Sequence, residues 1–281
     1  MTTEIECMRR DLALKGYAQT TQDRYLKTAT TLIARFGRPA GQLTREDLRL
    51  YVEELQGQGR SASWLRNQLS AVLFLYRKTL GRDEMVSFVS LPRKHSPLPD
   101  VLSLKERQGL LNAIREPRYQ AIAMVMYGAG LRISEVLVLE VRDIDGPRGV
   151  IRVRHGKGNK AREAKLSPSL YQWLRGYWRR EQPPGPYLFA SKKTGKLPQA
   201  DTVRDAIRHA AKDAWIKKRV TPHVLRHSFA THLLEQGTDV HVVSALLGHA
   251  SITTTARYAR VTRKLVRQTP SPLDLLPQRR C

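Results

Sequence analysis

The segment 221–248 constrains the fold of this chain more than any other stretch, because it predicts two consecutive helices with well-defined ends. Thr221 is a suitable N-cap for a first helix that continues to about Gln236, where Gly237 stops it. A second helix is expected over residues 240–247. Apolar residues recur at four-residue steps in the first helix, so one of its faces should be buried. The fold must therefore supply a core for this face.

Four polar side chains in and after this segment are candidates for an anion-binding site. His223 and Arg226 are three residues apart, on one side of the first helical turn. The positive end of a helix favours a bound anion at that place. His249 follows the second helix, and Tyr258 lies about two turns into a third helix that Ser251 can cap. Each residue alone is more often a packing or capping residue, but together they could surround one phosphodiester.

A further arginine follows a glycine-containing break upstream. An apolar helix ends at Gly128 and Gly130, and the amphipathic segment that follows contains Arg132 and Glu135. The two charged residues could form an ordinary i, i+3 ion pair on a solvated face. Arg132, however, stands between two apolar neighbours, where a half-buried guanidinium needs an anionic partner. This arginine is therefore a second cationic candidate for the site.

A basic β-hairpin is predicted after this segment. In its first strand Arg152 and Arg154 alternate with apolar residues, and its second strand begins at Arg162. The turn between the strands contains Lys157 and Lys160, and two glycines flank Lys157. The usual explanation of such a lysine is a solvated basic turn. The alternative is a mobile cation that reaches a bound anion.

The net charge predicts a polyanionic partner. It is +24 over 281 residues, and such self-repulsion is costly unless phosphates offset it. Nucleic acid is favoured over an anionic membrane, since no long apolar or basic amphipathic helix is evident. The first ten residues contain no signal-peptide core, and Cys7 and Cys281 indicate neither a disulfide framework nor a metal motif. We expect a cytoplasmic, nucleoid-associated protein whose partner is double-stranded DNA, without a membrane.

The motifs together carry a resemblance to a known family. GLRISEVLVL, HGKGNKAR, HVLRH and LLGHAS, followed by Tyr258, resemble the successive boxes of the tyrosine recombinases, also called the phage integrase family. They are most similar to Xer-like and mobile-element integrases. Five boxes in order are specific, whereas HxxR alone would be weak. The resemblance covers nearly the whole chain.

The resemblance implies a catalytic set of six residues and one supporting acid, namely Arg132, Lys157, His223, Arg226, His249 and Tyr258, with Glu135 in support. Tyr258 would attack the phosphodiester, and Lys157 would protonate the leaving 5′ oxygen. The two arginines and His249 would bind the phosphate, while His223 could accept the phenolic proton. Four residues of the hairpin are expected to bind DNA: Arg152, Arg154, Lys160 and Arg162.

The implied reaction is site-specific recombination. It passes through a 3′-phosphotyrosyl enzyme and a Holliday junction, in a tetramer on inverted-repeat-like sites. The scheme needs neither ATP nor a cofactor or metal, and no acidic cluster suggests a metal site. A type IB topoisomerase, which uses a similar residue set, and a DNA-binding regulator without chemistry are the alternatives. Dimer resolution, phage integration, cassette capture and transposon movement all stay open as host processes, with a mobile element favoured.

Composition divides the chain into three parts. Residues 1–86 predict four helices, similar to the core-binding domain of the family. Residues 87–100 contain three prolines and predict an extended linker. Residues 101–281 predict an α-rich catalytic domain with a C-terminal tail, whose prolines shorten any helix that could dock on a neighbouring protomer. The expected fold class is mainly α with a small antiparallel β-sheet.

Overall fold

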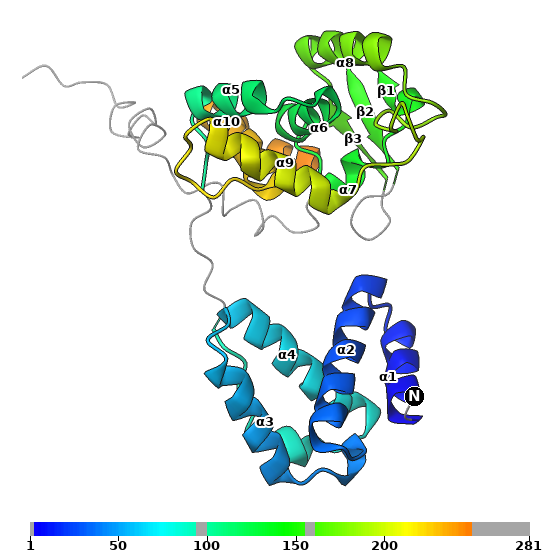
Figure 1. Cartoon of the computed structure of the whole chain (residues 1–281), viewed down its shortest axis with the longest axis vertical. Coiled ribbons are helices and arrows are strands. Elements are labelled where there is room, and N and C mark those ends of the chain that lie inside the picture. Colours follow the sequence, from blue (N-terminus) through cyan, green and yellow to red (C-terminus); the bar gives the residue numbers. More distant parts are fainter. Residues whose placement is uncertain (1–2, 94–99, 155–160, 249–281) are drawn as a thin grey trace, which may run out of the picture. The chain divides into compact units, whose positions relative to one another are not determined.

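The computed structural model describes residues 3–93, 100–154 and 161–248 (Figure 1). The chain forms two compact units, Met1–Pro97 and Leu98–Cys281. Within the described ranges, no helix is both long and apolar enough to cross a membrane.

The described part of the N-terminal unit is built mainly from four α-helices, as the sequence predicts. They are α1 (Thr3–Leu14), α2 (Gln19–Phe36), α3 (Arg45–Gly57) and α4 (Ala62–Phe74). A reciprocal capping box between Thr44 and Asp47 starts α3, and Gly37 ends α2 in the left-handed conformation. Both devices satisfy backbone groups that a helix end leaves unpaired.

Helix α4 does not continue as a regular α-helix beyond Phe74. It changes to a π-helical turn over Leu75–Thr79. This turn keeps the Tyr76 ring in the core of the unit, where its hydroxyl donates a hydrogen bond of 2.7 Å to the carbonyl of Ala40. Burial of the ring raises the pKa of the Tyr76 hydroxyl well above its usual value. Periodicity alone does not distinguish a π turn from an α-helix.

The first residues of the expected linker pack on the helical unit. Val89 is buried in its core, and Phe88 and Leu91 lie against it. Arg66 also donates a hydrogen bond of 2.8 Å to the carbonyl of Pro92. Residues 88–92 of the expected linker therefore lie on the helical unit, because these apolar side chains find a core to pack on. The division at residues 86 and 100 stays a prediction.

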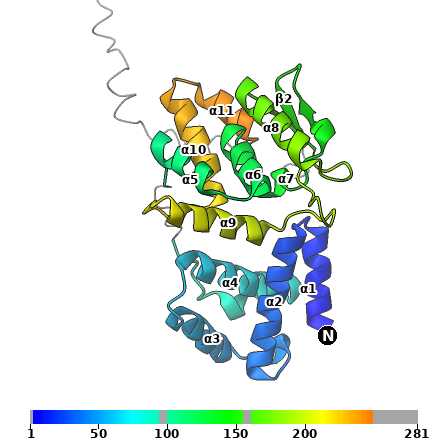
Figure 2. The ribbon, with the colours of Figure 1, turned by 45° about the horizontal axis from the view of Figure 1, so that its top comes forward.

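The C-terminal unit combines helices with a small sheet, which confirms the predicted fold class. Its described helices are α5 (Leu104–Ala113), α6 (Pro117–Gly128), α7 (Ile133–Val136), α8 (Pro168–Glu181), α9 (Ala200–Asp213), α10 (Pro222–Glu235) and α11 (Val240–Leu247). The strands β1 (Ile144–Asp145), β2 (Val150–Val153) and β3 (Arg162–Lys165) form an antiparallel sheet in that order. Figures 1 and 2 show α8 beside this sheet. The two-residue strand β1 was not predicted.

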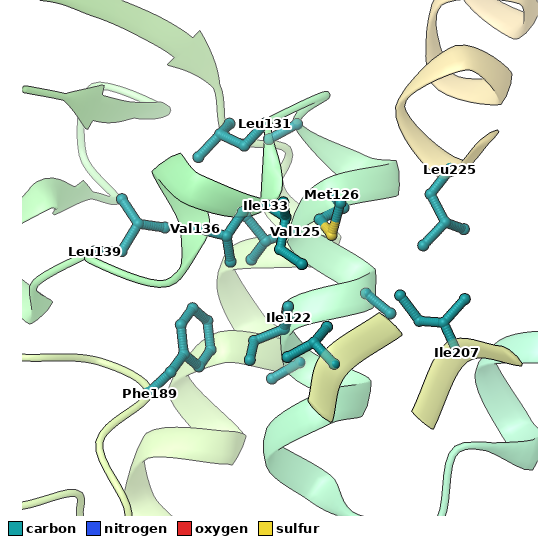
Figure 3. Close-up of a cluster of buried hydrophobic side chains, with 14 of the residues drawn as sticks. Ile122, Val125, Met126, Leu131, Ile133, Val136, Leu139, Phe189, Ile207 and Leu225 are labelled. Atoms are coloured by element: carbon teal, nitrogen blue, oxygen red, sulfur yellow. The ribbon is translucent and has the colours of Figure 1, made fainter. Parts of the chain in front are cut away.

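Helix α6 lies at the centre of the C-terminal unit. It packs against α5, α8, α9 and α10, and most of its apolar side chains are buried. Figure 3 shows Ile122 and Met126 of α6 among residues from other elements, including Ile207 of α9 and Leu225 of α10. A helix that is apolar all round must be enclosed by its neighbours. Enclosure of α6 fixes α7 and α10 around a common point, where the candidate site lies.

Gly130 provides a test of this packing. Its φ is +65°, and a Cβ atom there would lie 2.5 Å from Cδ1 of Phe229 on α10. Gly130→Ala should lower the free energy of unfolding by about 2–4 kcal/mol, from left-handed strain together with overpacking. Urea denaturation measures the change.

Gly237→Ala is the matched control, because Gly237 also has a positive φ, of +88°, but has no atom within 4 Å of an added Cβ. It should cost only about 1 kcal/mol. Equal losses for the two variants would contradict the packing argument.

Candidate active site

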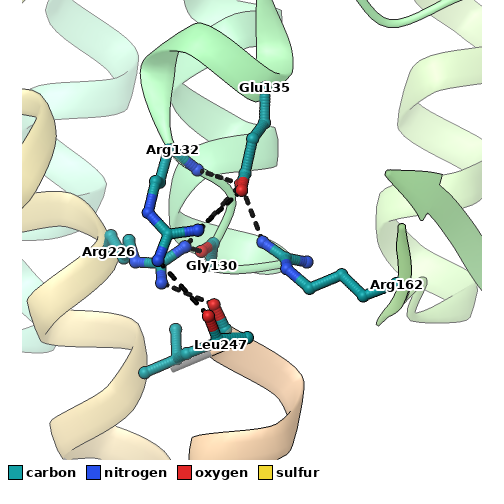
Figure 4. A network of polar contacts seen from close by, with 7 residues as sticks. Gly130, Arg132, Glu135, Arg162, Arg226 and Leu247 are labelled. Atoms are coloured by element: carbon teal, nitrogen blue, oxygen red, sulfur yellow. Dashed lines mark hydrogen bonds and ion pairs between the residues drawn. The ribbon is translucent and has the colours of Figure 1, made fainter. Parts of the chain in front are cut away.

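The polar cluster of the C-terminal unit forms around the carboxylate of Glu135 (Figure 4). This side chain is only 1% exposed. Its two oxygens lie 2.7 Å from Nη1 of Arg132 and 2.7 Å from Nη2 of Arg162. Nη1 of Arg226 is 3.8 Å away. Three guanidiniums thus share one buried carboxylate, and charge attraction offsets part of the cost of removing these groups from water.

The local sequence places Arg132 and Glu135 through a helix cap. Arg132 is the N-cap residue of the short helix α7, with extended backbone angles. Its backbone N–H donates a hydrogen bond of 2.7 Å to the Glu135 carboxylate. The pair is therefore an i, i+3 ion pair, but it lies in the interior rather than on a solvated face. Glu135 is thus the anionic partner of the half-buried guanidinium, and the role of Arg132 in a phosphate site stays a prediction.

The second arginine of the predicted pair joins three segments of the chain. Arg226 lies in the first turn of α10 and is 4% exposed. Its guanidinium donates hydrogen bonds to the carbonyls of Gly130 and Leu247, the latter at 2.7 Å. Arg132 reaches the neighbouring carbonyl of Gly248 at 3.5 Å. Both arginines therefore stabilise the negative C-terminal end of α11.

Arg162 lies in this cluster and not on the exposed face expected of a DNA-binding residue. Its side chain is 12% exposed and packs so closely on Gly248 that an added Cβ there would collide with it. Burial lowers the pKa of Arg162, while the charge of Glu135 opposes that change. The strand pattern could not reveal this, because the Arg162–Glu135 contact joins segments far apart in the sequence. DNA binding by Arg162 stays a prediction, but its geometry is that of a partner for Glu135.

The other two described hairpin arginines also form ion pairs within the chain. Nη2 of Arg152 lies 2.6 Å from the Asp145 carboxylate. Nη2 of Arg154 lies 2.7 Å from Glu140 and 2.9 Å from Asp143. Both arginines remain partly exposed, so they can still reach a phosphate. Their role in DNA binding stays a prediction.

His223 lies at the surface beside the arginine cluster, in the same helical turn as Arg226. Partial burial lowers the pKa of His223, and the charges of Arg226, Arg204 and Arg132 lower it further. The lowered pKa favours the neutral imidazole. A neutral imidazole can accept a proton, as the predicted role requires.

A basic cavity of about 560 Å³ opens beside His223. Its wall includes Arg204, Arg208 and Lys212 of α9, together with the segment 216–222. The sequence analysis did not single out these cations. Their four-residue spacing places them on one face of α9, and this signal could have revealed them. The cavity extends the positive surface away from the arginine cluster.

Several predicted residues lie outside the described part of the chain: Lys157, Lys160, His249 and Tyr258, with the helix expected after Ser251. The structure brings Arg132, Arg226 and Glu135 together and places His223 beside them. Among the described residues, no group of three or more His, Cys, Asp or Glu side chains is arranged to hold a metal ion.

Comparison with known proteins identifies the family. Residues 5–84 match the N-terminal SAM-like domain of phage integrases, and residues 100–264 match the phage integrase family. The integrase/recombinase y4qK of Sinorhizobium fredii is 39% identical over 99% of this chain and 91% of its own length. The tyrosine recombinase XerA of Pyrococcus furiosus is 34% identical over 94% of this chain and 92% of its own length.

A solved structure shows the same fold. The XerH site-specific recombinase bound to a palindromic difH substrate has a TM-score of 0.71 at 20% identity, over 90% of this chain and 80% of that one. The match of both domains, together with relatives that are similar over nearly their full lengths, leads to one conclusion. The chain belongs to the phage integrase family and is a tyrosine recombinase, an enzyme of site-specific DNA recombination.

Proposed function

We propose that the described cluster binds the scissile phosphate of duplex DNA and that Tyr258 is the nucleophile. The strongest support is that Arg132 and Arg226, which are far apart in the sequence, both lie against Glu135. His223 lies on the same helix as Arg226, three residues before it. Two guanidiniums suit the nonbridging oxygens of a phosphate, whose charge grows in the transition state. His249 donates a further hydrogen bond to the same phosphate.

In the proposed cleavage step, one phosphorus–oxygen bond replaces another. The Tyr258 oxygen attacks phosphorus as the bond to the 5′ oxygen breaks, which leaves a 3′-phosphotyrosyl link. His223 accepts the phenolic proton, and Lys157 protonates the leaving 5′ oxygen. A 5′-hydroxyl from a partner duplex reverses the step, because the link retains the energy of the phosphodiester. Two such exchanges pass through a Holliday junction without ATP.

Glu135 holds the arginines in this scheme and does not react. Counted over the described residues alone, three guanidiniums and one carboxylate give the cluster two excess positive charges, three minus one. A buried site with excess positive charge attracts a phosphate more strongly than an exposed one, because little water screens it. The carboxylate fixes the guanidiniums before the phosphate arrives, so little rearrangement accompanies the reaction.

The partner that we propose is double-stranded DNA with inverted-repeat-like sites, held by a tetramer. The net charge of +24 supports a polyanionic partner, and the XerH neighbour is described as bound to a palindromic substrate. In this arrangement residues 1–86 bind DNA, residues 87–100 link the domains and residues 101–281 carry the chemistry. Lys160, Arg152 and Arg154 add contacts to the backbone. The protein then works in the cytoplasm, at the nucleoid.

Tyr258→Phe tests the nucleophile. The variant should bind DNA as the wild type does but form no covalent adduct, since it lacks the attacking oxygen. Protein expressed in a bacterial host and isolated under denaturing conditions is assayed for attached DNA, whose sequence also gives the cleavage site. Tyr171→Phe on α8 is the control and should retain the adduct. An adduct formed by the Tyr258 variant would assign the attack to another residue.

Glu135→Gln tests the shared carboxylate. The substitution keeps the shape of the side chain but removes the buried carboxylate that the three guanidiniums share, so the free energy of unfolding should fall by about 3 kcal/mol. Adduct formation should slow by about a hundredfold, because the arginines lose their alignment. Glu163→Gln on β3 is the control. Glu163 is half-exposed, and its ion pair with Arg148 is long, at 3.9 Å, so its loss should change little. If the Glu135 and Glu163 variants behave alike in urea denaturation and cleavage, the cluster is not organised as proposed.

The pH dependence of cleavage tests His223. Only the neutral imidazole accepts a proton, so the rate should fall as the pH drops through the lowered pKa of His223, below its ordinary value of 6.5. Arg204→Gln removes one of the charges that lower this pKa. The fall in rate at acid pH, the acid limb of the profile, should therefore move to higher pH. Arg208→Gln is the control, because Arg208 lines the same cavity without acting on His223. An acid limb that stays in place in the Arg204 variant would exclude His223 as its origin.

A further inference from the structure

Trp215 is an unusual residue directly after helix α9. It is 91% exposed, more than any other large hydrophobic side chain in the described part of the chain. Its φ is 55°, in the left-handed region that L side chains rarely adopt. Both features are unfavourable for a bulky aromatic residue: the left-handed backbone is strained, and the apolar ring is exposed to water.

The left-handed backbone has a structural cause that does not require tryptophan. The N–H of Trp215 bonds to the carbonyl of Lys212 and that of Ile216 to the carbonyl of Ala211, each at 2.9 Å. This pattern closes the C-terminus of α9, and the residue in this position is usually glycine. The cap accounts for the backbone angle but not for an indole at this position, and the exposed ring is available for a contact with another molecule.

The surroundings of Trp215 indicate the chemistry of that contact. Lys212, Ile216 and Lys217 line the basic cavity that leads to His223, and Arg219 follows them in its wall. Within the described ranges, Lys212, Lys217 and Arg219 form no ion pair. Trp215 is thus flanked in the sequence by cations that no described residue neutralises, and these match a phosphate backbone.

We propose that Trp215 is a DNA contact, in which the indole packs on a deoxyribose while the neighbouring cations bind the adjacent phosphates. Its ring supplies an apolar face for the sugar, and its N–H can donate to a phosphate oxygen. The contact is independent of base sequence, because every nucleotide offers the same sugar. This inference rests on the proposed function, namely that the arginine cluster next to this cavity binds a phosphate of duplex DNA.

The experiment compares Trp215→Gly, Trp215→Phe and the control Gln182→Gly in the full chain. Gln182 ends α8, is exposed and also has a positive φ, of 40°. Binding is measured by fluorescence anisotropy with a short labelled duplex of random sequence, and stability by thermal unfolding. Trp215→Gly should bind about five- to tenfold more weakly, in the range of an aromatic contact to a nucleotide. Trp215→Phe should retain most of the affinity, and Gln182→Gly all of it.

Thermal unfolding and salt dependence separate a contact from a structural role. Neither glycine variant should lower the melting temperature, because glycine accepts a positive φ and little buried surface is lost. The slope of log affinity against log salt should be unchanged in Trp215→Gly, since no charge is removed, but shallower in Lys217→Ala. A melting temperature several degrees lower in Trp215→Gly would show that the ring supports the fold and would overturn the inference.

Two further outcomes would contradict the proposal. If Trp215→Gly binds the duplex as tightly as the wild type, the ring does not contact DNA. If that variant loses only its self-association, measured by sedimentation, the ring contacts a second copy of the chain instead. If the wild type itself fails to bind duplex DNA, the proposed function fails and the inference falls with it. The wild-type measurement thus separates the two failures.

Discussion

The buried carboxylate of Glu135 is the interaction on which the candidate site depends. Without it, the guanidiniums of Arg132, Arg162 and Arg226 would repel one another in an interior that offers little water. With it, they stay together and keep an excess of positive charge. This is the electrostatic condition for binding a phosphate whose charge grows during a reaction. The Glu135 carboxylate thus stabilises the packing of the three arginines and also supports the proposed chemistry.

The site is also a joint between helices. Arg226 and Arg132 bond to the last carbonyls of α11, at Leu247 and Gly248, and Arg226 bonds to Gly130 in the turn before α7. These bonds replace the water that would otherwise cover the end of a helix. The groups proposed to hold the phosphate therefore hold α7, α10 and α11 as well. Such dual use gives a rigid site, because the arginines are fixed by several bonds each.

Local features of the fold could be predicted from the sequence, and non-local ones could not. The ends of α10 and α11 follow from Thr221, Asp239 and Gly248, because a cap depends only on residues within one turn. The Arg132–Glu135 pair follows from spacing and from its apolar neighbours. The burial of Arg162 does not, because its partner lies in another element. The packing of Val89 likewise depends on a core that no local pattern describes.

Helix α10 carries the site on one face and the core on another. Leu225 is buried against the central helices and Phe229 packs on Gly130, while His223 and Arg226 belong to the candidate site. An α-helix turns by about 100° per residue. An inserted or deleted residue in its first turn would therefore swing the histidine to another side of the helix while the apolar face stayed in place. Relatives that differ in length should accordingly place their length changes in loops outside this turn.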